Sequence, residues 1–165
     1  LVLYCTGVSD ISPLHNMPLK SLSLAGTKVS DIAPLEGMPL QHLTLDNTPV
    51  SNINALQKMP LEFLGISFTH VEDLSPLKGM PLKELRIARS KVKDLSPLAG
   101  MQLNNLILSH TFPGSYKRRK WDEIPTTNRY SRGIDGIRNL ESLQTIDNIP
   151  AEEFWRRFDR KQFPQ

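Results

Sequence analysis

The hydrophobic residues of the chain recur with a constant period over its first two thirds. Alternation such as Leu22-Ser23-Leu24 predicts a short strand with one buried face. The pattern returns every 21 residues, and strands are expected to begin near Leu1, Leu22, Leu43, Leu64, Leu85 and Leu106. A weaker match, Leu140-x-x-Leu143-x-Thr145, predicts a seventh strand. This periodicity is typical of a repeat protein, in which each unit buries its apolar face only against its neighbours.

Three further columns keep the 21-residue step. They are Met17, Met38, Met59, Met80, Met101; Thr6, Thr27, Thr48, Thr69, Ser90, Thr111; and Asp10, Asp31, Asn52, Asp73, Asp94. We interpret the methionines as core filler and the threonine hydroxyls as bonding the backbone of their own turn and of the next unit. The aspartates precede Ile/Leu-Ser/Ala-Pro-Leu, a context that favours capping of a short 3₁₀ or helical turn. Metal or redox chemistry by the methionines and calcium binding by the aspartates are the alternatives.

The unit as a whole reads L-x-x-L-x-L-x-x-T-x-V, as in Leu40-Gln-His-Leu-Thr-Leu-Asp-Asn-Thr-Pro-Val50. It resembles the bacterial, internalin-like leucine-rich repeat, with threonine where that family usually has asparagine. The resemblance implies an α/β solenoid with a parallel sheet on its concave face and 3₁₀ or helical turns on its convex face. The Gly-Met-Pro-Leu junction resembles repeats at the C-terminal end of planctomycete-type serine/threonine kinases and related large bacterial proteins. It implies a fragment of such a protein, cytoplasmic or extracytoplasmic. The ending Ala151-Glu-Glu-Phe-Trp resembles the terminus of the same proteins and implies that the parent ends near Gln165.

The period breaks after Thr111 and divides the chain into three expected regions. Residues 1–111 hold the repeats with a truncated first unit, 112–132 form a basic loop insertion, and 133–165 hold a last degenerate repeat with a C-terminal capping helix. Residues 112–138 carry 7 basic and 3 acidic residues, whereas the rest of the chain has almost no net charge. Ile134, Ile137 and Leu140 are spaced for a short convex helix. The tail from Pro150 predicts a helix whose apolar face is Phe154, Trp155 and Phe158.

The sequence contains none of the motifs that would indicate an enzyme. It has no Gly-rich phosphate loop, no H-R-D or D-F-G kinase signature and no G-x-S-x-G nucleophile motif. The single Cys5 excludes an internal disulfide framework and a cysteine zinc cluster. The histidines do not pair at metal-ligand spacing, and no apolar run is long enough to span a membrane. We therefore expect no catalytic residue, no metal and no cofactor in this chain.

Concave surfaces are what solenoids use for binding, and the outward strand positions can be counted from the repeat. Most of them hold small or polar residues. The candidate protein-binding residues on this face are Tyr4, His42, Phe63, Phe68, Arg86, Arg89 and His110. Aromatic residues beside arginines are typical of interface hot spots. In the alternative interpretation, the two phenylalanines lie flat on neighbouring units and stabilise the sheet.

The basic loop supplies a second candidate surface. Its residues Lys117, Arg118, Arg119, Lys120 and Trp121 combine clustered charge with an aromatic ring, which suits an anionic partner. A solvated loop is the alternative. Our leading hypothesis is a monomeric, non-catalytic protein-interaction module that uses the concave sheet face and binds protein rather than nucleic acid. The competing hypotheses are a sensor or substrate-recruiting arm of a serine/threonine kinase, a structural spacer, and phosphate or nucleic-acid contact through residues 117–121.

Overall fold

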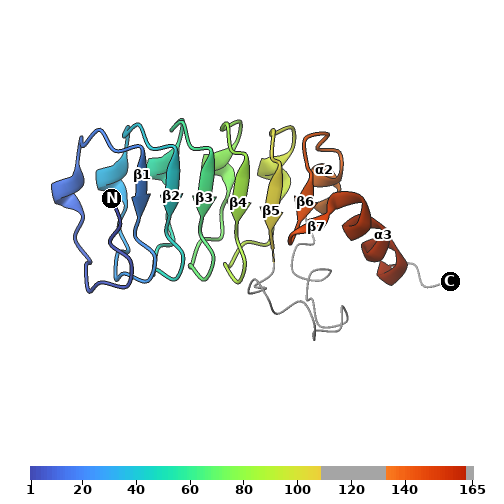
Figure 1. Cartoon of the computed structure of the whole chain (residues 1–165), viewed down its shortest axis with the longest axis horizontal. Coiled ribbons are helices and arrows are strands. Elements are labelled where there is room, and N and C mark those ends of the chain that lie inside the picture. Colours follow the sequence, from blue (N-terminus) through green and yellow to red (C-terminus); the bar gives the residue numbers. More distant parts are fainter. Residues whose placement is uncertain (109–132, 163–165) are drawn as a thin grey trace.

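The computed structural model describes residues 1–108 and 133–162, which form a stack of similar units that share one sheet (Figure 1). The strands follow the order of the sequence across the sheet. They are β1 (Ser21–Ser23), β2 (His42–Thr44), β3 (Phe63–Gly65), β4 (Glu84–Arg86), β5 (Asn105–Ile107), β6 (Thr145–Ile146) and β7 (Ile149–Pro150). The first six strands pair in parallel, and β7 pairs antiparallel with β6. The parallel sheet expected from the alternating leucines is therefore present.

The register of the sheet equals the sequence period. Leu64 lies opposite Leu43 on one side and Leu85 on the other, and all three are fully buried. Like residues therefore stack into one continuous core. The expected strand near Leu1 is reduced to a single bridge between Val2 and Ser23. Because it has a neighbour on one side only in this structure, the first unit leaves its apolar side chains exposed: Leu1, Val2, Tyr4 and Met17.

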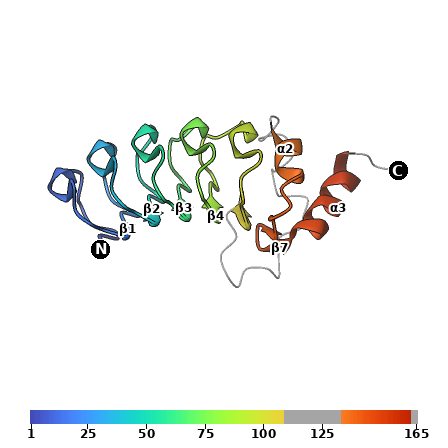
Figure 2. The ribbon, with the colours of Figure 1, turned by 90° about the horizontal axis from the view of Figure 1, so that it is seen from above.

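Short 3₁₀ turns form the outer side of a shallow arc, and the sheet lines its inner side (Figure 2). The turns are η1 (Ser12–Leu14), η2 (Ala33–Leu35), η3 (Asn54–Leu56), η4 (Ser75–Leu77) and η5 (Ser96–Leu98). The predicted capping is confirmed, since Asp31 Oδ1 accepts the Ala33 N–H at 2.9 Å and its equivalents do the same. The methionine column is buried except for Met17. These contacts make each unit a closed loop of backbone around the leucine core.

The threonine column behaves differently from the prediction. Thr27, Thr48 and Thr69 each donate to the carbonyl three residues earlier, at 2.6 Å. The oxygen of a hydroxyl can also accept, but among the described residues no backbone N–H of the next unit donates to these three oxygens. The first half of the expectation is confirmed and the second half is wrong.

The C-terminal unit departs from the repeat. It contains α2 (Ile134–Arg138) on the convex side and α3 (Ala151–Gln162) after β7. Both expected helices are present, and Phe154 of α3 is buried while Trp155 and Phe158 pack against the core. The predicted phase of this unit is wrong. The strand β6 lies within residues 143–146, where a strand is expected, but Ile146 rather than Leu143 lies opposite Leu106, a register three residues later than the Leu140 motif implied.

Candidate functional site

A ladder of three side chains crosses the concave face from β2 to β4. His42, Phe63 and Arg86 belong to three consecutive strands whose leucines point inward, so these three side chains lie on the opposite, outward side. The His42 and Phe63 rings stack with centroids 6.4 Å apart, and the Arg86 guanidinium lies 4.8 Å from the Phe63 centroid. Three of the predicted residues are thus in contact. Phe63 lies between its two neighbours, as the alternative interpretation also expects.

Two basic side chains at or near this ladder, Arg86 and Lys83, form ion pairs with acidic side chains. Arg86 pairs with Glu84, with 2.7 Å between its guanidinium NH2 and Oε1, and Lys83 Nζ lies 2.7 Å from Glu62 Oε2. The hydrogen bond from Lys83 lowers the pKa of Glu62. Both pairs are solvent-exposed, and such pairs contribute at most about 1 kcal/mol each. They fix side-chain positions and neutralise part of the face.

Phe68 and Arg89 form a second aromatic–arginine stack at the corner where the strand ends. The Arg89 guanidinium lies 5.5 Å from the Phe68 ring centroid. Both residues have left-handed backbone, with φ of 57° and 54°. Gly26 and Asn47 occupy the same column with φ of 69° and 56°, and glycine and asparagine tolerate this conformation. Glycine and asparagine in this column could have predicted the left-handed backbone at the corner from the sequence, but the sequence analysis did not use them.

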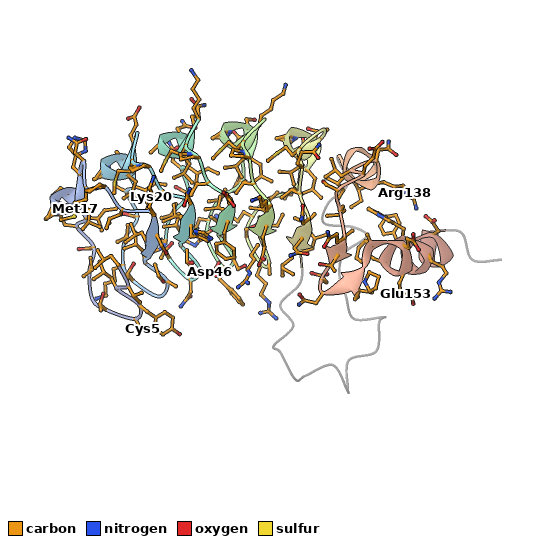
Figure 3. All side chains as sticks on the ribbon, turned by 45° about the horizontal axis from the view of Figure 1, so that its top comes forward. Cys5, Met17, Lys20, Asp46, Arg138 and Glu153 are labelled. Carbon is orange, nitrogen blue, oxygen red and sulfur yellow. The ribbon has the colours of Figure 1, made fainter. Side chains whose placement is uncertain are left out.

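Asp46 is a concave-face residue that the sequence analysis did not select. Its Oδ1 accepts the Ser67 N–H of the next unit at 2.6 Å (Figure 3 labels Asp46 beside the sheet). Gly65 makes room for this contact, since a Cβ there would lie 3.0 Å from the Asp46 carboxylate oxygens. The carboxylate ties two units together through the backbone. Only the pairing of an acidic residue with a glycine 19 positions later could have indicated it.

The remaining predicted residues lie apart from these stacks or outside the description. Tyr4 is exposed in the first unit, and a hydrogen bond with the Cys5 side chain raises its pKa. His110 and the basic loop residues Lys117, Arg118, Arg119, Lys120 and Trp121 lie outside the described residues. In the described ranges, 1–108 and 133–162, no three His, Cys, Asp or Glu side chains converge as metal ligands. Over those ranges, no helix has the length and apolarity needed to cross a membrane.

Comparisons with solved structures decide the fold family. No protein-family model matches the chain, and no curated protein matches its sequence. Among 36 matching chains of known structure is internalin C2 from Listeria monocytogenes. It is 25% identical with a TM-score of 0.60, over 87% of this chain and 68% of that one. The fold is a leucine-rich-repeat solenoid. The internalin-like resemblance of the sequence is therefore confirmed at the level of the fold.

Proposed function

We propose that this leucine-rich-repeat solenoid is a non-catalytic protein-interaction module that binds its partner on the concave sheet face. The observation that carries the proposal is the ladder of His42, Phe63 and Arg86. It presents two rings and a guanidinium on the inner side of the arc, side by side and in fixed positions. Aromatic residues and arginine are enriched among the residues that carry most of the binding energy in protein interfaces.

The fold supports a protein partner for a geometric reason. A stack of parallel strands gives a long, shallow surface rather than a deep cavity, and extended shallow surfaces match other proteins better than small molecules. The likeness to an internalin supports the same class of function. The narrower version, a sensor or recruiting arm of a serine/threonine kinase, is supported only by the resemblance of the Gly-Met-Pro-Leu junctions.

The test is a pull-down from lysate of the source organism with three baits of matched melting temperature. The first is the wild-type chain, and the second carries Phe63→Ala and Arg86→Ala. The third carries Glu36→Ala and Lys78→Ala, which removes exposed side chains directly after two convex turns. We expect proteins that bind the wild type and the convex variant but not the concave variant. Equal capture by all three baits would place the binding site elsewhere.

A further inference from the structure

The two aromatic–arginine stacks of the concave side have the same architecture. In each, an arginine of the fourth complete unit covers a phenylalanine of the third: Arg86 over Phe63 and Arg89 over Phe68. Stacking on a ring occupies one flat face of a guanidinium. The N–H groups around its edge remain available to an acceptor that lies in the same plane.

The stacks differ in how the arginine charge is compensated. Arg86 uses its edge on Glu84 of its own strand, with Nε donating to Oε1 at 2.8 Å. Arg89 is exposed, and it forms no ion pair with any side chain that the structure describes. Two carboxylates of the preceding units have donors of their own, since Glu62 binds Lys83 and Asp46 binds the Ser67 N–H. Within the described part of this face, Arg89 is therefore a cation whose edge is available.

The backbone at this corner is strained at both residues of the second stack. A left-handed conformation is strained for bulky residues. It is held at Phe68 and Arg89, as at Cys5 of the first unit, whereas Gly26 and Asn47 serve in the two units between. An asparagine at either position would form the same turn with less strain. Strain retained in two neighbouring residues, one half-buried and one exposed, is typical of binding sites.

We propose that Arg89, whose guanidinium lies over the Phe68 ring, binds an aspartate or glutamate side chain of a protein partner that occupies the concave face. A carboxylate is planar and accepts two parallel N–H bonds from a guanidinium edge, which suits the open side of this stack. The partly buried Phe68 ring restricts water on one side and strengthens the pair. This inference rests on the proposed function and adds the chemistry of the partner.

A peptide selection tests the inference. Random dodecapeptides displayed on phage are selected against the immobilised chain, its Arg89→Asn variant and its Arg86→Gln variant. Asparagine suits the left-handed backbone, as Asn47 shows, so Arg89→Asn should melt no lower than the wild type. We expect Asp and Glu to be enriched at one peptide position by the wild type and by Arg86→Gln, and the enrichment to vanish with Arg89→Asn.

Affinity measurements on the best acidic peptide then isolate the contact. Arg89→Asn should weaken its binding about 10- to 100-fold, the range for a hydrogen bond to a charged group. Arg89→Lys should recover part of the lost affinity. Replacing Glu by Gln in the peptide should not weaken its binding to the Arg89→Asn variant any further.

Each other result overturns the inference, and the results separate it from the proposed function. Selected peptides without acidic enrichment would overturn the inference alone, provided that Phe63→Ala still removes their binding. If a fluorescent dT12 oligonucleotide binds the chain and loses this binding with Arg89→Asn, the group that Arg89 binds is a phosphate rather than a carboxylate, and the inference is overturned. No peptide retained by the wild type above the bare support would contradict both proposals.

Discussion

The regular units and the C-terminal unit bury the same kind of apolar face by different means. A regular unit has one three-residue strand and one three-residue 3₁₀ turn, and its apolar face is buried by the neighbouring repeats. The C-terminal unit uses the two-residue strand β6, the antiparallel β7 and the helices α2 and α3. Its α3 contacts β6 and β7, which covers the last edge of the sheet (Figure 1).

The difference teaches where each region gets its stability. In the inner regular units the strand leucines lie opposite equivalent leucines on both sides, so stability is a sum of nearest-neighbour interfaces. The C-terminal unit has such an interface with the preceding repeat only. On its other side it is stabilised by contacts that do not recur in the repeats. Arg138, for example, lies 5.0 Å from the Trp155 ring and pairs with Asp159. Four substitutions sharpen this comparison.

The largest effect is expected in the middle of the regular stack. Leu64→Ala removes a fully buried side chain that packs between Leu43 and Leu85. Both interfaces lose contacts, so the free energy of unfolding should fall by about 4 kcal/mol, within the usual range for buried leucine. Urea denaturation followed by circular dichroism measures it. A loss below about 1 kcal/mol would contradict the two-sided packing.

The next effect tests the joint between the two regions. Gly133 precedes α2 with φ of 78°, and a Cβ there would collide with the Ser96 backbone nitrogen of η5. Gly133→Ala should therefore cost about 3 kcal/mol, from left-handed strain and overpacking together. Gly100→Ala is the matched control, because Gly100 has φ of 75° and open space around it. If both variants lose the same stability, the close approach of α2 to η5 does not constrain the joint.

A smaller effect of opposite sign is expected in the convex corners of the regular units. Gly37, Gly79 and Gly100 take left-handed backbone there, and Lys58 takes it with φ of 61°. Lys58→Gly should raise the free energy of unfolding by about 1 kcal/mol, because glycine adopts this conformation without strain. Thermal unfolding would show a higher melting temperature. A lower one would mean that the Lys58 side chain stabilises the corner.

The smallest effect concerns pH. Hydrogen bonds from Ser75 lower the pKa of Asp73, so its cap is worth most above the ordinary aspartate pKa and is lost as the pH falls through the lowered value. Asp73→Asn should keep the turn and flatten the acid limb of the stability curve. Asn52 already caps the equivalent turn at 2.8 Å without titrating. Urea titrations between pH 7 and 3 measure the difference, and parallel curves for the two proteins would contradict it.

Features that repeat could be predicted from the sequence, and features that occur once could not. The Leu64 column, the Asp31 caps and the Thr48 hydroxyl bond recur in several units, so one physical rule applies many times. The register of Ile146 was missed because an antiparallel strand, β7, pairs with β6 in place of another parallel one.

The candidate site divides in the same way. The contact between Phe63 and Arg86 follows from counting outward positions in adjacent units. The contact of Asp46 with Ser67 does not, because it depends on Gly65 being small in that unit alone. The ion pair between Arg86 and Glu84 lies within a single strand. Only the side-chain positions show that Arg89 has no such ion pair among the described side chains.

Oxidative footprinting of side chains tests the central claim, binding on the concave face, most directly. The chain is exposed to hydroxyl radicals alone and with the captured partner, and the labelling of individual residues is read by mass spectrometry. His42 and Phe63 report on the concave face, and His15, which directly follows the convex turn η1, is an exposed control. We predict that the partner slows labelling of His42 and Phe63 and leaves His15 unchanged. Protection of His15 with unchanged His42 and Phe63 would contradict the account.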